Sequence, residues 1–73
     1  MFVIVMKTVL SEIHYWDKYR SSGASNIDYC TRYDTSKKAL AAMKRTNEYR
    51  CMNINISRGI IGRYIEIYIE EIN

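Results

Sequence analysis

The sequence predicts a single small α+β domain over residues 1–73: a four-stranded, mostly antiparallel sheet with one packed helix, in the order β-β-α-β-β. Three stretches lead to this fold class. Phe2–Met6 is apolar at every position and largely β-branched, which is typical of a central strand buried on both faces. Lys37–Asn47 is rich in strong helix formers. Ile60–Ile72 alternates isoleucine with polar or aromatic residues, the period of a strand with one buried face.

The first strand leads into Ser11–Arg20, whose sequence is ambiguous. Its aromatic and β-branched residues favour a strand that extends the first one. The alternative is a helix capped by Ser11, which would change the order to β-α-β-α-β-β. Ser21–Asn26 then predicts a loop, and Ile27–Tyr33 predicts the return strand of a long hairpin.

The helix is predicted over residues 35–46, behind the N-cap cluster Asp34-Thr35-Ser36. Helical spacing brings Leu40 and Met43 onto the inward face, where they are expected to contact the strands that follow. The same spacing turns four basic side chains outward: Lys37, Lys38, Lys44 and Arg45.

Two further strands are predicted after the helix. Tyr49–Ser57 alternates, with Met52, Ile54 and Ile56 on the face expected to be buried. Arg58-Gly59 predicts the turn into the last strand, and Gly62 predicts a bulge. In the last strand, the parity expected to face the core contains Ile61, Ile65, Ile67 and Ile69. The parity expected on the opposite face contains Tyr64, Glu66, Tyr68 and Glu70.

Size and charge bound the function classes. A chain of 73 residues has a small core and marginal stability, so oligomerisation would be a natural supplement. Residues 32–50 carry six basic side chains against two acidic ones, whereas residues 64–73 carry three carboxylates and no base. Two cysteines are too few for a disulfide framework, and no signal peptide or membrane span is visible. We therefore expect a cytoplasmic protein with free thiols.

Gly59-Ile60-Ile61-Gly62 resembles the GXXG loop of KH nucleic-acid-binding modules, which clamps backbone phosphates between two helices. The resemblance covers seven residues, through Ile65. It departs from the KH pattern because the preceding segment alternates like a strand and both variable positions are isoleucine. We therefore interpret the motif as a hairpin turn.

Two surfaces are candidates for partner binding. The first is the outward basic face of the helix, which could contact phosphates or could simply be solvated. The second is the aromatic and acidic row of the last strand. That row could bind a basic partner, pair with a sister chain or face water.

Catalytic and metal-binding signals are weak. His14 could pair with Cys30 or Cys51 as base and nucleophile, but no third orienting residue or motif accompanies them. Glu66 and Glu70 would lie about 13 Å apart on one strand face, too far for either glycosidase mechanism. One histidine and two separated cysteines are too few ligands for a zinc site. We expect no enzyme activity, cofactor or metal.

As a type, a chain of this size, rich in Ile, Asn, Tyr and Lys, resembles small phage-encoded proteins that inhibit host machinery, including anti-CRISPR proteins. That resemblance implies a stoichiometric blocker in the host cytoplasm, which covers a surface of a protein or ribonucleoprotein complex that handles nucleic acid. Two other functions stay open. One is direct RNA or DNA binding through the basic helix, and the other is a structural homodimer or assembly subunit that pairs through exposed strands.

Overall fold

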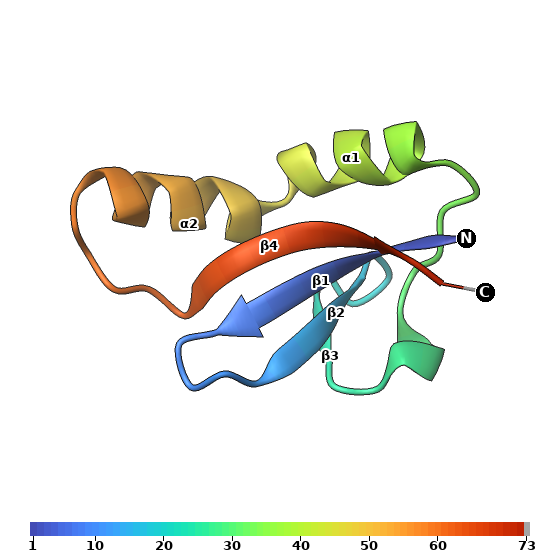
Figure 1. Cartoon of the computed structure of the whole chain (residues 1–73), viewed down its shortest axis with the longest axis horizontal. Coiled ribbons are helices and arrows are strands. Elements are labelled where there is room, and N and C mark those ends of the chain that lie inside the picture. Colours follow the sequence, from blue (N-terminus) through green and yellow to red (C-terminus); the bar gives the residue numbers. More distant parts are fainter. Residues whose placement is uncertain (73) are drawn as a thin grey trace.

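A computed structural model describes residues 1–72 as a twisted sheet that helices cover on one face (Figure 1). Its elements, in chain order, are β1 (Phe2–Thr8), β2 (Ile13–Asp17), β3 (Ser22–Ala24), the 3-10 turn η1 (Ile27–Tyr29), α1 (Ser36–Arg45), α2 (Asn47–Ser57) and β4 (Tyr64–Glu71). No helix within residues 1–72 is long and apolar enough to cross a membrane.

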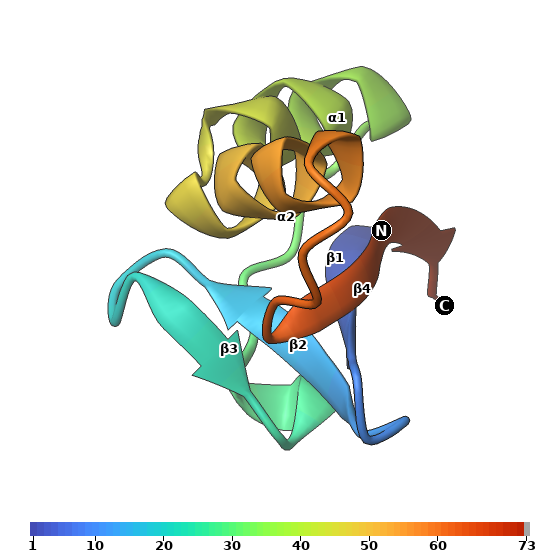
Figure 2. The same ribbon diagram turned by 90° about the vertical axis from the view of Figure 1, so that its left-hand side faces the viewer.

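Within those residues the sheet has four strands in the spatial order β3-β2-β1-β4, and every neighbouring pair is antiparallel. The helices α1 and α2 follow one another over the same face of the sheet (Figure 1, Figure 2). The α+β class and the four-stranded antiparallel sheet are confirmed, and Ser11–Arg20 does contain a strand, β2. The prediction that this strand extends the first one is wrong, because the chain turns between Thr8 and Ile13 and β2 pairs antiparallel with β1. The β-β-α-β-β order with one helix is wrong, because a second helix replaces a predicted strand.

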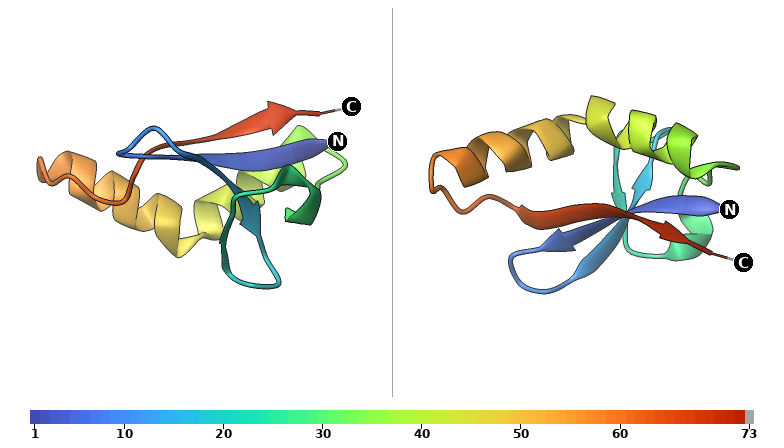
Figure 3. Two further views of the ribbon diagram at one scale, coloured as in Figure 1. Left: turned by 90° about the horizontal axis from the view of Figure 1, so that it is seen from below. Right: turned by 45° about the horizontal axis from the view of Figure 1, so that its top comes forward.

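β1 is the central strand, as its composition predicts. It pairs with β2 along one edge and with β4 along the other, so that the two ends of the described chain, residues 1–72, lie side by side (Figure 3). Val3, Ile4, Val5 and Met6 are all fully buried, and both faces of the strand therefore lie in the interior. The core beneath the helices contains Ile4, Met6, Trp16, Met43, Met52, Tyr64 and Ile67.

The strand predicted over Tyr49–Ser57 is wrong, because these residues lie in α2. Thr46 begins that helix: its Oγ1 accepts a hydrogen bond from the backbone N–H of Tyr49 at 3.2 Å. Tyr49 and Met52, three residues apart, pack on the core, whereas Ile54 and Ile56 are exposed. As a helix, this segment packs Tyr49 and Met52 on the core beneath the helices, which a fifth strand in the plane of the sheet would leave uncovered.

The first hairpin also differs from its prediction. The return strand is β3, inside the predicted loop Ser21–Asn26, and the predicted strand Ile27–Tyr33 contains η1 instead. Gly23 allows β3 to approach closely, since a Cβ there would lie 2.8 Å from Cε of Met6 and 2.9 Å from Cβ of His14. A glycine that is typical of loops in sequence is therefore a requirement of close strand packing.

β4 contains a bulge that changes which side chains reach the core. The register to β1 shifts between Tyr64 and Glu66, so Ile65 falls between two pairs. After the bulge the isoleucines face the core as predicted, and Ile67 is buried beneath the helices. Before the bulge the alternation is reversed: Tyr64 is buried and Ile65 is 45% exposed. Ile61, predicted to face the core, lies exposed in the preceding loop.

The Gly59–Gly62 motif lies between α2 and β4, so the predicted hairpin turn is wrong. Gly59 follows the end of α2 with a φ of 69°, which favours glycine, and its N–H donates to the carbonyl of Ile56 at 3.2 Å. The first glycine of the motif therefore ends a helix. The loop also departs from the KH arrangement, because a strand follows it where a KH loop has a second helix.

α1 confirms the predicted helix over residues 35–46, apart from its terminal residues. Thr35 is the N-cap, and its Oγ1 accepts a hydrogen bond from the N–H of Lys38 at 3.2 Å. Ala39 and Met43 are the buried residues of the helix. Leu40, predicted to be buried, is 40% exposed, because it lies about 100° around the helix from Ala39.

This arrangement predicts different costs for truncating two side chains of α1. Met43→Ala should lower the free energy of unfolding by about 2–5 kcal/mol, because it opens a cavity in the core. Leu40→Ala is the matched control and should cost clearly less, because a large part of that side chain is already in water. Urea unfolding measures both. An equal or greater loss for Leu40→Ala would contradict the assignment of Ala39 and Met43 to the buried face of α1.

Thr46 links the two helices. Its Oγ1 donates to the carbonyl of Met43 at 2.8 Å, which satisfies a carbonyl at the end of α1. The same oxygen accepts the N–H of Tyr49 at the start of α2. The residue is buried, so water cannot easily replace either bond.

We expect Thr46→Ala to lower the free energy of unfolding by about 0.5–2 kcal/mol, because both helix ends lose a partner. Thr46→Ser keeps the hydroxyl and should retain most of the stability. Thermal unfolding of the three proteins, followed by circular dichroism, compares them. If serine costs as much as alanine, the hydroxyl is not the source of the effect.

Candidate binding surfaces

The sheet face opposite the helices carries aromatic, aliphatic and charged side chains. Side chains alternate between the faces of a strand, so every second residue of β1, β2 and β4 lies on this side. We call it the outer face, and its residues are Val3, Val5, Lys7, Ile13, Tyr15, Asp17, Glu66, Tyr68 and Glu70. The two valines are buried, so the accessible surface comes mainly from the flanking strands.

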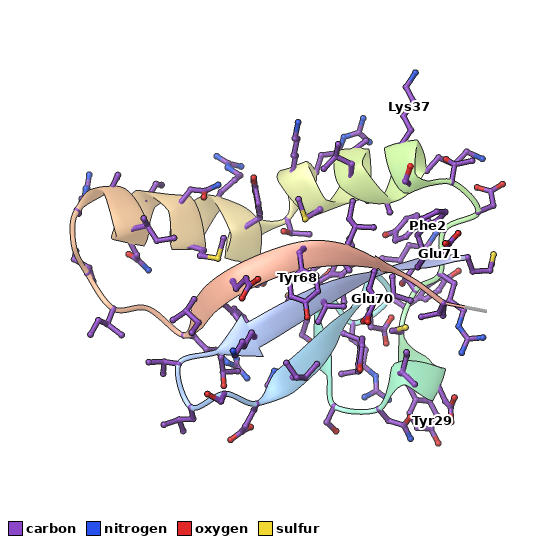
Figure 4. All side chains as sticks on the ribbon, viewed as in Figure 1. Phe2, Tyr29, Lys37, Tyr68, Glu70 and Glu71 are labelled. Atoms are coloured by element: carbon purple, nitrogen blue, oxygen red, sulfur yellow. The ribbon has the colours of Figure 1, made fainter. Side chains whose placement is uncertain are left out.

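Two tyrosines form the centre of the outer face. Val5 pairs with Tyr15 on one side and with Tyr68 on the other. Tyr68 is 36% exposed, and it leaves β4 on the same side as Glu70 (Figure 4). The pKa of the Tyr68 hydroxyl is raised above its ordinary value, mainly because the group loses hydration and further because Glu70 and Glu66 are negatively charged. Tyr68 therefore stays a neutral hydrogen-bond donor at physiological pH.

Tyr64, predicted to belong to the same row, lies on the helix side instead. Its hydroxyl is 3.3 Å from Nδ1 of His14, and the two rings meet edge to face with centroids 6.0 Å apart. Burial raises the pKa of Tyr64, the charge of Arg63 opposes that rise and the charge of Glu48 adds to it. The row predicted on β4 therefore loses Tyr64, and Tyr15 of β2 supplies the second aromatic ring of the outer face.

The basic helix face lies on the other side of the molecule. Its four side chains are exposed on α1: Lys37, Lys38, Lys44 and Arg45. Lys37 points away from the sheet (Figure 4). Nζ of Lys38 lies 3.0 Å from Oδ1 of Asp34, and this contact lowers the pKa of the Asp34 carboxyl. The pair is solvent-exposed, so we expect it to contribute little stability.

The nucleophile–base pair considered from the sequence is not assembled. Among residues 1–72 the polar contacts of His14 are with Tyr64 and with Glu12, whose Oε2 lies 3.6 Å from Nε2. Cys30 donates from Sγ to the carbonyl of Ile27 at 3.0 Å. In the same part of the chain, no group of three or more His, Cys, Asp and Glu side chains could hold a metal ion.

A groove between α1 and β4 is a feature that sequence reasoning missed. It has a volume of about 620 Å³ and is lined by Phe2, Ser36, Lys37, Leu40, Ile69 and Glu71. Three separate segments of the chain supply these residues, and no motif connects them. The groove depends on the rotation of α1 against the sheet, which leaves Leu40 partly exposed. No pattern in the sequence indicates that rotation.

In comparisons with known proteins, no family model, no curated protein and no solved structure matches the chain.

Cys30 and Cys51 are both free thiols in different environments. Cys51 is exposed on α2, whereas Cys30 is partly buried, and this burial raises its pKa. We expect iodoacetamide at about pH 8 to alkylate Cys51 faster than Cys30, because the thiolate is the reactive form. Peptide mass spectrometry over time measures both rates, and in denaturant the rates should converge. Faster alkylation of Cys30, or a disulfide in the non-reduced protein, would contradict this description.

Proposed function

We propose that the chain is a non-enzymatic binding module that covers a surface of a larger protein or ribonucleoprotein complex. The observation that carries the proposal is the centre of the outer face, where Tyr15 and Tyr68 flank a buried valine. Protein interfaces concentrate tyrosine, because its large amphipathic ring has few rotatable bonds and loses little entropy on binding. Strands that pair on both sides of β1 hold these two rings in place.

The charge of this side of the molecule supports a basic partner. On the outer face, Glu66 and Glu70 of β4 supply two carboxylates, and Lys7 of β1, which pairs with Glu66, supplies one positive charge. A protein surface that normally holds nucleic acid is basic, and an acidic, aromatic face complements it. We therefore propose inhibition of a complex that handles nucleic acid, in the host cytoplasm. The resemblance in size and composition to phage-encoded inhibitors supports this mode of action.

A second candidate is direct binding of RNA or DNA through the basic helix face. The observation that favours it is the exposure of Lys37, Lys44 and Arg45 on one outward side of α1. Each could neutralise a phosphate and release a counterion. The two candidates use opposite sides of the molecule, so substitutions can separate them.

Reversing the charge of one side at a time tests the proposal. We expect Glu66→Lys, Glu70→Lys and Tyr68→Ser together to weaken capture of the partner complex by about 2 kcal/mol or more, because central residues dominate such interfaces. The measurement is affinity capture from a lysate of the source cells, quantified by mass spectrometry. The control changes Lys38, Lys44 and Arg45 of the basic helix face to Glu, keeps Lys37 because it lines the groove beside β4, and should capture the same complex as the wild type.

Titration with bare RNA and DNA provides the opposing outcome. Fluorescence anisotropy at two salt concentrations should show weak binding at about 150 mM salt. Sub-micromolar binding that falls steeply with salt, and that the basic-face variant loses, would contradict the proposal and support the second candidate.

A further inference from the structure

The outer edge of β4 is the long open edge of the sheet. Within residues 1–72, β4 pairs only with β1, and it spans eight residues. The opposite edge is β3, which has three residues. Figure 1 shows β4 along the front margin of the sheet, beside the helices. An open edge presents backbone N–H and C=O groups to any strand that approaches it.

The pairing of β1 identifies the backbone groups at this edge. Phe2 exchanges both of its backbone hydrogen bonds with Tyr33, at 2.7 and 2.8 Å, on the side of β1 away from β4. Hydrogen bonding alternates along an antiparallel strand, so Val3 turns its backbone toward β4 and its partner Glu70. By the same alternation, the backbone groups that point away from β1 belong to Ile67, Ile69 and Glu71.

Different side chains flank the two sides of this edge. On the helix side lies the groove between α1 and β4, where Phe2, Leu40 and Ile69 offer apolar surface. Lys37 and Glu71 also line this groove and supply one charge of each sign. On the outer side, Glu66 and Glu70 offer carboxylates. A strand added at this edge would therefore meet apolar surface with every second side chain and negative charge with the others.

The charge of β4 decides between a second copy and a different partner. β4 lacks proline and lysine, the residues that commonly protect an edge strand. It carries three carboxylates instead: Glu66, Glu70 and Glu71. Antiparallel pairing of two copies would bring both sets together, and like charges on neighbouring strands are destabilising. The edge therefore disfavours its own copy and favours a basic segment.

We propose that β4 binds an extended basic segment of the partner as an added antiparallel strand. Apolar side chains of the segment enter the groove between α1 and β4, and its basic side chains lie beside Glu66 and Glu70. Its backbone pairs with Ile67 and Ile69. The inference rests on the proposed function and specifies the part of the partner that is bound: a segment that alternates basic and apolar residues.

The probe is a fluorescent peptide that alternates lysine and valine. We expect a Kd of roughly 10–100 μM by anisotropy at about 50 mM salt, and no binding of a glutamate–valine peptide. Residues that hydrogen-bond directly across an antiparallel pair share a face, so the valines are the residues that pair with β4. N-methylation of the valines should therefore abolish binding, whereas N-methylation of the lysines should preserve it at equal charge. Failure of the lysine–valine peptide to bind, or binding that survives methylation of the valines, would overturn the proposal.

Substitutions in the protein give the converse test. Glu70→Lys should weaken binding of the lysine–valine peptide roughly tenfold. Asp28→Lys, an exposed position on η1, changes the net charge equally and should have no comparable effect. Ile69→Pro removes an outward N–H and no hydrogen bond to β1, so binding should be lost while the circular dichroism spectrum is kept. If Ile69→Pro unfolds the chain, the methylated peptides still decide the question.

Two further outcomes separate this inference from its alternatives. A wild-type dimer in light scattering that Ile69→Pro dissociates would overturn the proposal in favour of self-pairing. Partner capture that survives Ile69→Pro, but not the triple substitution of the outer face, would overturn strand addition and leave the proposed function standing. Capture that survives both variants would overturn both.

Discussion

Burial of both faces of β1 is the constraint on which the other elements depend, because that strand has no polar side for water to contact. The helices cover one face through Met43 and Met52. On the other face, Val5 is buried between Tyr15 and Tyr68. The two tyrosines therefore serve the core and the surface together. This double use explains how a domain with so little interior keeps aromatic rings at a surface where a partner can reach them.

The two charged sides of the molecule follow from the same layering. The α1 lysines and arginine point away from the sheet, because Ala39 and Met43 occupy the helix face that meets it. Glu66 and Glu70 of β4 point to the outer face, because the intervening isoleucines take the helix side. A charge distribution of this kind orients the molecule in the field of a charged partner before contact. The side that leads into the encounter then depends on the sign of the partner's charge.

The sequence was sufficient for features that short-range patterns decide. The burial of Val3–Met6, the cap and helix of α1 and the alternation after Glu66 all follow from composition and spacing. The features it missed depend on distant partners. Over Tyr49–Ser57 the alternating pattern points to Met52, Ile54 and Ile56, whereas the helix packs Tyr49 and Met52 on the core and leaves Ile54 and Ile56 exposed. Which pattern prevails depends on the core that distant strands present to this segment. The bulge that exposes Ile65 is defined only against the register of β1, so the outer face could be predicted only in part.

The pairing of β1 with β4 joins residues from opposite ends of the described chain, and Phe2 lies opposite Glu71. Contacts of such large sequence separation slow folding, because a long loop must close before they form. During synthesis, the three-stranded meander of β1, β2 and β3 emerges well before β4. Until β4 arrives, the most apolar strand of the protein keeps one edge unpaired, and nascent chains that meet at that edge can aggregate. The same topology that centres the sheet on β1 thus leaves this strand half paired until β4 has been made.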